Sequence, residues 1–250
     1  MKIYQQILQK KSDGHKQFAI LVDPDKINND QIEKLCYTAT ENGVDYIFVG
    51  GSLITNNSLA NCVRRIKYAC PLPVVLFPGN GNHIDEQADA LLFLSLISGR
   101  NPDLLIGKHV VSAPLIREKQ LEAIPTGYML IESGNITTAL YMSNTSPIPA
   151  DKPDIAACTA MAGEMLGLKM IFMDGGSGAL NPVNIEMIKA VRKVIQIPLI
   201  VGGGIKTPEK AAENCKAGAD MIVIGNSIEK DPSILKEVAE AVKKSIVFED

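Results

Sequence analysis

Short apolar runs recur along the chain, and most of them end at glycine or at a small polar residue. Eight runs fit this pattern, at residues 18–22, 45–49, 73–77, 90–96, 128–131, 169–173, 198–201 and 220–224. They are rich in aliphatic residues and lack polar alternation, which predicts strands buried on both faces. Stretches with helical signals separate most of the runs, so strands and helices are predicted to alternate.

The helical stretches carry recognisable start and stop signals. Thr207 and Pro208 form an N-cap and a first helical position after the seventh run. Pro114 is expected to bend or end the helix that follows the fourth run. Helices are predicted at 3–10, from Asn29 or Asp30 to residue 42, at 58–69, 101–119 and 153–166, from residues 181–182, after Thr207, and at 232–244.

Two connections depart from the alternation. The segment between the third and fourth runs is too short and too rich in glycine and asparagine for a full helix, so a degenerate helical unit is expected there. Residues 135–152 contain two prolines and are predicted to form a long loop with an extra strand.

Eight strands alternating with helices predict a (β/α)8 TIM barrel, and 250 residues is a usual length for that fold. No linker or composition break divides residues 1–250, so a single domain is expected. A doubly wound open sheet is the competing architecture. It usually has fewer strands and a glycine fingerprint after the first strand, where this chain has Asp23 and Asp25.

Composition narrows the functional classes. The chain is 46% hydrophobic and 21% charged, as in ordinary soluble proteins. A net charge of -3 and a pI near 5.7 argue against a nucleic-acid partner, which needs a basic face. Five scattered cysteines predict reduced thiols in a cytoplasmic protein, not a zinc site. Neither a signal peptide nor a transmembrane segment is expected.

Two glycine-rich loops follow the last two predicted strands. Residues 202–204 end the seventh strand and Gly225 ends the eighth. Backbone amides at such loops, beside a helix N-terminus, can bind a phosphate. TIM barrels commonly use these two loops for that purpose, which predicts a phosphate site near the C-terminus. The alternative is that the glycines only form tight turns.

Charged residues at the predicted strand ends suggest chemistry. Asp23 follows the first strand and suits Mg²⁺, which takes few protein ligands, although it can also cap its own loop. Asp174 ends the sixth strand and can accept a proton from a substrate hydroxyl, or can simply order its loop. Lys26, Lys206 and Arg100 are candidates to neutralise phosphate. The three histidines are isolated and predicted to be surface or packing residues.

Five motifs occur in order, at residues 23–26, 49–52, 172–178, 202–206 and 225–226. In these motifs the chain resembles the geranylgeranylglyceryl phosphate synthase family, which includes bacterial relatives that make heptaprenylglyceryl phosphate. Residues 77–80, 94–96 and 100–102 resemble the longer, second subgroup of that family. The likeness covers nearly the whole chain.

The resemblance implies a Mg²⁺-dependent prenyltransferase on a (β/α)8 barrel. It would join sn-glycerol 1-phosphate to geranylgeranyl diphosphate through an ether bond and release diphosphate. Another prenyl chain length is the alternative within the family. Outside it, a phosphate-binding barrel that acts as an isomerase, or one that binds without turnover, remains open. The resemblance also implies a homo-oligomer, either dimer or hexamer, and transient membrane contact for the lipid product is an expectation.

The resemblance also assigns roles by position. Asp23 and Ser52 would ligate Mg²⁺, and Asp174 would act as the general base. Where the family usually has Tyr-Leu-Glu, this chain has Phe172, Met173 and Asp174, so the carboxylate is shorter and the phenol is missing. Glycerol phosphate would be bound by Phe172, Met173, Asp174, Gly175, Gly176, Ser177, Gly178, Gly203, Gly204, Gly225 and Asn226.

Overall fold

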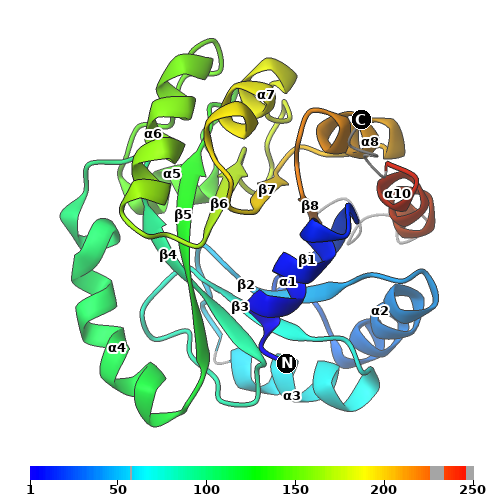
Figure 1. The fold of residues 1–250 in the computed structure, drawn as a ribbon. Coiled ribbons are helices and arrows are strands. Elements are labelled where there is room, and N and C mark those ends of the chain that lie inside the picture. Colours follow the sequence, from blue (N-terminus) through cyan, green and yellow to red (C-terminus); the bar gives the residue numbers. More distant parts are fainter. Residues whose placement is uncertain (57, 226–233, 246–250) are drawn as a thin grey trace.

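The computed structural model describes residues 1–56, 58–225 and 234–245. Eight parallel strands close into a barrel, in which each strand pairs with its neighbour in sequence and β8 pairs with β1 (Figure 1). The predicted (β/α)8 barrel is therefore confirmed. The strands are β1 Gln17–Val22, β2 Tyr46–Gly51, β3 Val74–Pro78, β4 Ala90–Leu96, β5 Glu122–Leu130, β6 Met170–Asp174, β7 Leu199–Gly202 and β8 Met221–Ile224.

Helices surround the barrel, and one helix lies across its lower end, where the strands begin. The helices are α1 Ile3–Ser12, α2 Asn29–Glu41, α3 Leu59–Ala69, the π-helix η1 Asp103–Gly107, α4 Lys108–Glu118, α5 Thr138–Ser143, α6 Pro153–Met165, α7 Ile185–Val194, α8 Pro208–Lys216 and α10 Ile234–Lys243. Within the described ranges, no helix has both the length and the apolar character that crossing a membrane requires.

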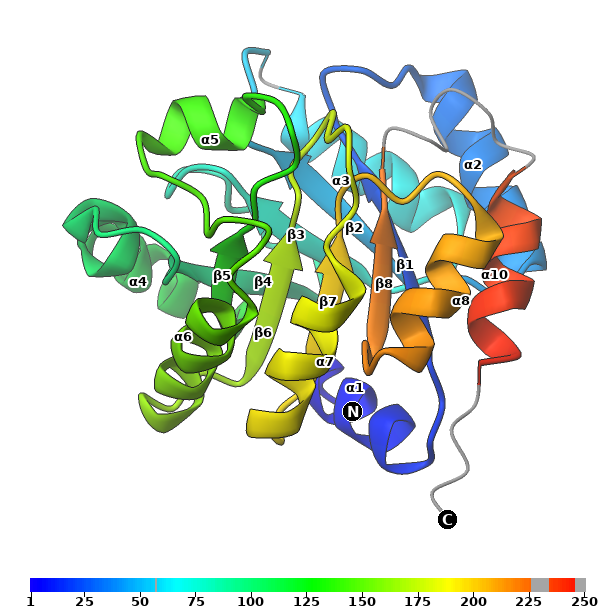
Figure 2. The same ribbon diagram turned by 90° about the horizontal axis from the view of Figure 1, so that it is seen from above.

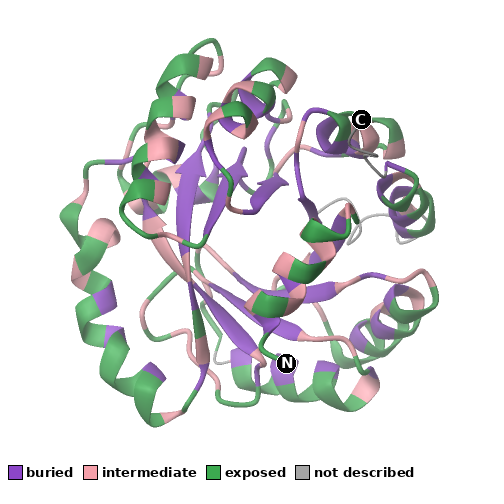
Figure 3. Ribbon diagram, viewed as in Figure 1, coloured by how far each residue is buried: buried purple, intermediate pink, exposed green. Residues whose placement is uncertain are grey.

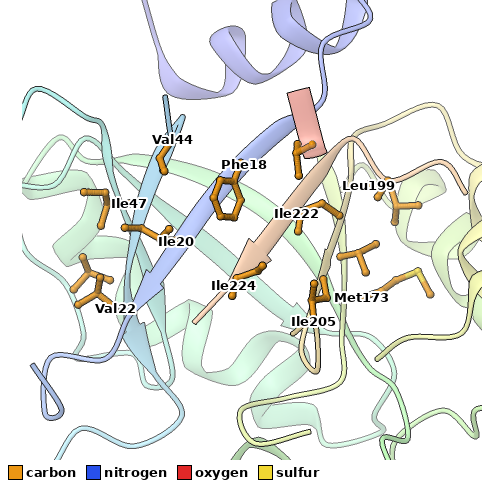
Figure 4. Close-up of a cluster of buried hydrophobic side chains, with 14 of the residues drawn as sticks. Phe18, Ile20, Val22, Val44, Ile47, Met173, Leu199, Ile205, Ile222 and Ile224 are labelled. Atoms are coloured by element: carbon orange, nitrogen blue, oxygen red, sulfur yellow. The ribbon is translucent and has the colours of Figure 1, made fainter. Parts of the chain in front are cut away.

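Both faces of the strands are buried, which explains the continuous apolar runs. Phe18, Ile20 and Val22 of β1 point outward and pack under the surrounding helices (Figure 4). Ala19 points inward and belongs to a second cluster that fills the barrel. Figure 3 shows the same division, with buried positions on the strands and on the inner sides of most helices.

Helix α1 closes the lower end of the barrel (Figure 2). Ile3 and Ile7 are buried in the cluster that fills the barrel interior. The Glu122 carboxylate, at the start of β5, accepts hydrogen bonds from the backbone nitrogens of Ile3 at 2.7 Å and Tyr4 at 3.2 Å. These bonds satisfy donors at the helix N-terminus, where negative charge is also favoured by the helix dipole.

Strand β5 starts at Glu122, well before the predicted start at residue 128. Pro125 and Gly127 hid this part of the strand, because both residues usually weaken a central strand. Here the carbonyl of Pro125 still accepts a ladder hydrogen bond from Lys169, at 2.8 Å. A Cβ at Gly127 would lie 2.8–2.9 Å from the terminal methyl groups of Ile97, Ile171 and Leu168, so close packing outside the barrel favours a glycine.

Residues 138–143 form helix α5, so the prediction of a loop with an extra strand was wrong there. The Thr137 hydroxyl accepts from the backbone nitrogen of Leu140 at 3.3 Å and caps this helix. Nearby pairing is limited to an isolated bridge between Ile131 and Ile148. Residues 79–89 form turns, as expected for a degenerate unit between β3 and β4.

Several helix ends also differ from the prediction. Asn28 caps α2, in place of Asn29 or Asp30, and Asn184 caps α7, in place of residues 181–182. Pro114 lies inside α4 without ending it. The carbonyl left without a donor belongs to exposed Val110, where water can replace the lost bond. The Thr207 cap is confirmed, and the predicted start at residue 232 lies outside the described residues.

The closing role of α1 can be tested with Ile7→Ala. Because Ile7 is 1% exposed, removal of its side chain should lower the free energy of unfolding by about 2–5 kcal/mol. Ile136 is 76% exposed, so Ile136→Ala is the matched control and should change it by less than about 0.5 kcal/mol. Denaturant unfolding of both variants measures the difference, and equal small effects would show that α1 does not contribute to the core.

Candidate functional site

A cavity of about 730 Å³ opens where the strands end, on the side of the barrel opposite α1. The closed barrel brings together loops that are far apart in sequence. Met173 points away from the cavity into the outer core (Figure 4), and Asn226 lies outside the described residues. Ten of the residues predicted for the site line the cavity: Asp23, Ser52, Phe172, Asp174, Gly176, Ser177, Gly178, Gly203, Gly204 and Gly225.

Gly175 lies behind this lining and supports it. Its backbone nitrogen donates to the carbonyl of Gly202 at 3.1 Å, which ties the loop after β6 to the end of β7. Lys26 and Lys206 also line the cavity. Arg100 does not, because its guanidinium donates to the Gly99 carbonyl at 2.7 Å and faces a separate cavity beside α6.

Asp174 is the buried acid of this site. It ends β6 beside Gly202 of β7, and only 8% of it is exposed. The Tyr128 hydroxyl donates to its Oδ2 at 2.6 Å, and the backbone nitrogen of Gly176 donates to its Oδ1 at 2.7 Å. Burial raises the pKa of Asp174, and these two hydrogen bonds oppose that shift. The carboxylate is thus a stronger base than an exposed aspartate.

Three aromatic rings form the floor of the cavity beneath Asp174. The ring centroids of Phe77, Tyr128 and Phe172 lie 5.5–5.7 Å apart, in tilted and edge-to-face arrangements. All three residues also line the cavity. This apolar floor separates Asp174 from the rest of the barrel interior and leaves its carboxylate facing the opening.

Gly203 is required by the close approach of two loops. Its φ is +80°, and a Cβ there would lie 2.6 Å from Asp174 Oδ1 and 2.6 Å from the Gly175 nitrogen. A side chain at this position is excluded by both the backbone conformation and the crowding. The loop after β7 therefore packs directly on the loop after β6, and both contribute backbone to the cavity wall.

The loops after β1 and β2 are joined by Asp25. Its carboxylate accepts from the Thr55 nitrogen at 2.6 Å, the Thr55 hydroxyl at 2.8 Å and the Ser58 hydroxyl at 2.7 Å. These bonds, with the Thr55 amide the largest cause, lower the pKa of Asp25 to about 2. They fix the loop that carries Ser52 next to the loop that carries Asp23.

Asp23 and Ser52 are the predicted metal ligands. Asp23 Oδ2 pairs with Lys26 at 2.7 Å, and Oδ1 accepts from the Asp25 nitrogen at 3.1 Å. Among the described residues there is no group of three or more histidine, cysteine, aspartate or glutamate side chains that could hold a metal. One carboxylate and one hydroxyl fit Mg²⁺, which keeps several waters and takes phosphate oxygens from its substrate.

A narrower apolar cavity of about 220 Å³ adjoins the first. It extends between β4 and the segment formed by η1 and α4, next to the turns at residues 79–84 that replace a helix after β3. Ser52, Phe77 and Tyr128 line both cavities, so the two meet at these residues. Its apolar walls include Ile84, Leu92, Leu94, Leu96, Leu104 and Ile116.

His109 is buried against this groove and acts in packing, as predicted. Its Nε2 lies 3.2 Å from the Ser95 hydroxyl, and its ring packs edge-to-face on Phe93 at 4.5 Å. Burial lowers the pKa of His109, which keeps the ring neutral at pH 7. His83 is half-buried, and burial lowers its pKa as well.

Sequence reasoning missed Tyr128 and the apolar groove. The predicted strand began at Tyr128, which placed this residue at the lower end of the barrel; the true start at Glu122 moves it to the mouth. The groove joins β3 and β4 to residues of η1 and α4. The short connection between the third and fourth strands was its one visible signal.

Comparison with known proteins agrees with this geometry. The sequence profile of the PcrB family matches residues 6–243. The geranylgeranylglyceryl phosphate synthases of Chitinophaga pinensis and Spirosoma linguale are 56% and 53% identical to this chain, and the alignments cover 96% and 94% of each chain. The crystal structure of (S)-3-O-geranylgeranylglyceryl phosphate synthase from Thermoplasma acidophilum, in complex with sn-glycerol-1-phosphate, has a TM-score of 0.92 at 30% identity, with 98% of this chain and 99% of that chain covered.

The predicted role of Gly203 in anion binding can be tested with Gly203→Ala. The added methyl group would displace the Asp174 carboxylate and the backbone beside it, so affinity for inorganic phosphate should fall by about tenfold or more. Isothermal titration calorimetry measures this.

Gly167→Ala is the matched control. Gly167 has a φ of +89° but no atom within 4 Å of an added Cβ, so it carries the same backbone strain of about 1–2 kcal/mol without the crowding. Its phosphate affinity should equal that of the unaltered protein. Equal affinities for both variants would show that the Gly203 loop does not bind the anion.

Proposed function

The chain belongs to the PcrB family, and from this membership we propose that it is a prenyltransferase that joins sn-glycerol 1-phosphate to geranylgeranyl diphosphate. The names of its relatives and the Thermoplasma acidophilum complex support both the reaction and the phosphorylated acceptor. The observation that carries the proposal is the junction of a glycine-lined cavity with an apolar groove, because the reaction needs a polar and a lipid substrate in contact.

The acceptor phosphate would bind at the loops after β7 and β8. Gly203, Gly204 and Gly225 line the cavity there, and α8 begins just beyond the first loop. Backbone amides and a helix N-terminus stabilise negative charge without a side chain. Lys206 lines the same side and adds a positive charge. A phosphate fixed here leaves the glycerol hydroxyls to extend toward Asp174.

The diphosphate would bind at the loops after β1 and β2, which follow the phosphate loops around the mouth because β8 pairs with β1. Asp23 and Ser52 would hold Mg²⁺ there, and the ion would neutralise charge on the diphosphate leaving group. Lys26 lies 2.7 Å from Asp23 and contributes a second positive charge. Asp25 keeps the two loops together through its bonds to Thr55 and Ser58.

The transfer would occur between these two sites. A glycerol hydroxyl oxygen forms a bond to C1 of the prenyl group while the bond from C1 to the diphosphate oxygen breaks. The electron pair of that bond leaves with diphosphate, and the hydroxyl proton goes to the Asp174 carboxylate. Asp174 suits this role because burial makes it a better base, and because both substrates are held at fixed positions around it.

The prenyl tail would occupy the apolar groove. The groove begins at Phe77 and Tyr128, beside the reacting centre, and continues between β4 and α4. A hydrocarbon chain placed there is removed from water, which favours binding in proportion to the apolar area buried. A different tail length within the same chemistry remains the alternative. An isomerase of a small phosphorylated compound would not use this groove.

The remaining expectations stay predictions. These are the single domain over residues 1–250, cytoplasmic location, assembly into a homo-oligomer as dimer or hexamer, and transient contact with membranes for release of the lipid product.

The reaction can be tested by measuring diphosphate release. With geranylgeranyl diphosphate and Mg²⁺, diphosphate should appear only when sn-glycerol 1-phosphate is added, and EDTA should stop it. Asp174→Asn should lower the rate by about 10²–10⁴-fold with glycerol phosphate still bound. Absence of diphosphate with either enantiomer of glycerol phosphate would reject the transferase, and binding of both substrates without product would favour a binding protein.

The groove can be tested with Ser112→Phe, a buried position on α4 that lines it. The larger ring should narrow the groove and lower kcat/KM for geranylgeranyl diphosphate about tenfold more than for the shorter geranyl diphosphate. Val111→Phe is the control, because Val111 is 78% exposed on the same helix. If Ser112→Phe changes both substrates equally, the tail does not occupy this groove.

A further inference from the structure

Tyr128 stands out because it belongs to both cavities and contacts the proposed base. The register of β5 and β6 pairs Tyr128 with Phe172, and both residues lie in the cluster that fills the barrel. Asp174 is two residues beyond Phe172, so it faces the same side of the sheet. The barrel geometry thus places the phenol of one strand against the carboxylate of the next.

The hydrogen bond between them has a defined direction. Tyr128 is buried, and burial together with the nearby Asp174 charge holds its pKa well above its ordinary value. It is therefore neutral at working pH and donates its proton to Asp174 Oδ2, at 2.6 Å. In the floor made by Phe77, Tyr128 and Phe172, Tyr128 alone carries a hydroxyl.

We propose that Tyr128 is a positioning residue, which holds the Asp174 carboxylate at the point where the glycerol phosphate cavity meets the apolar groove. The proposal rests on the transferase function above. With Oδ2 bonded to Tyr128 and Oδ1 bonded to Gly176, the carboxylate cannot rotate, and each oxygen keeps a lone pair for the substrate hydroxyl. A short aspartate side chain is thereby fixed in one orientation.

The hydrogen bond also affects the pH range in which Asp174 can accept a proton. Donation from Tyr128 favours the charged carboxylate, so it opposes the effect of burial on the pKa of Asp174. In the transfer, the hydroxyl proton moves to Asp174 as the bond to C1 forms and diphosphate leaves; Tyr128 keeps its own proton throughout. Other charged groups facing this cavity are Asp23, Asp25 and Lys26 after β1 and Lys206 after β7.

The test is Tyr128→Phe, which removes the hydroxyl and keeps the ring. We expect kcat to fall about 10- to 100-fold, the effect of losing one hydrogen bond to a charged group, with little change in KM for glycerol phosphate. In the unaltered protein, kcat/KM should fall at acidic pH, as Asp174 becomes protonated. In Tyr128→Phe this fall should begin at higher pH, because the carboxylate has lost a stabilising donor.

Tyr46→Phe is the matched control. Tyr46 is also a buried tyrosine of the barrel interior, and its hydroxyl donates to Gln17 Oε1 at 3.1 Å, away from the mouth. A merely structural effect of removing a buried hydroxyl would appear in both variants as reduced stability. The fall of kcat/KM at acidic pH should move to higher pH in Tyr128→Phe alone. If this fall occurs at the same pH as in the unaltered protein and kcat is unchanged, the proposal is overturned.

A direct titration separates this proposal from the proposed function. Carbon NMR of protein labelled at the aspartate carboxyl carbons reports the pKa of Asp174, with Asp174→Asn identifying its signal. An upward shift of this pKa in Tyr128→Phe is the expected result, and an equal pKa in both proteins would refute the hydrogen bond's role. If the unaltered protein releases no diphosphate, the proposed function fails, whereas the titration still decides whether Tyr128 controls the carboxylate.

Discussion

Pairing of β8 with β1 is the constraint on which the rest of the structure depends. Without it the strands would form an open sheet, whose ends diverge. With it, the carboxyl ends of eight strands surround one opening, and residues as distant in sequence as Asp23 and Gly225 line one cavity. Each loop can then be short and specialised, because the barrel fixes its two ends. Helix α1 closes the other end and adds Ile3 and Ile7 to the cluster that fills the interior.

The mouth combines two opposite electrostatic environments. On one side, Asp174 is buried above aromatic rings and beside glycine loops, where a charge is costly and a proton is readily accepted. On the other side, Asp25 accepts several hydrogen bonds, which lower its pKa to about 2 and keep it ionised at neutral pH. Two aspartates on the same opening therefore differ: burial suits Asp174 to the proposed role of base, and hydrogen bonds fix Asp25 as an anchor between loops. Their surroundings, not their chemistry, make the difference.

Much of this architecture could be predicted from the sequence. Each strand is apolar on both faces and most end at small residues, so seven of the eight runs locate the strands to within a residue or two. β5 was the exception, because Pro125 and Gly127 are both unfavourable in a central strand, and the crowding around Gly127 by the side chains of Ile97 and its neighbours is visible only in the fold. Because of that error, Tyr128 was not predicted to lie at the barrel mouth. The apolar groove could not be predicted for a related reason. Its walls come from β4 and α4, and no local sequence pattern shows how far apart these two elements lie in the fold.

The turns at residues 79–89 leave one side of the barrel without its usual helical cover. On the proposed function, this gap would let acceptor chemistry and donor length be set by different parts of the chain. The proposed phosphate site lies at the loops after the last two strands, whereas the apolar groove proposed for the prenyl tail is bounded by η1 and α4. If the tail binds there as proposed, substitutions on η1 and α4 would change the chain length that fits without touching the residues around Asp174. On that proposal, one scaffold would suit lipid precursors of different tail lengths.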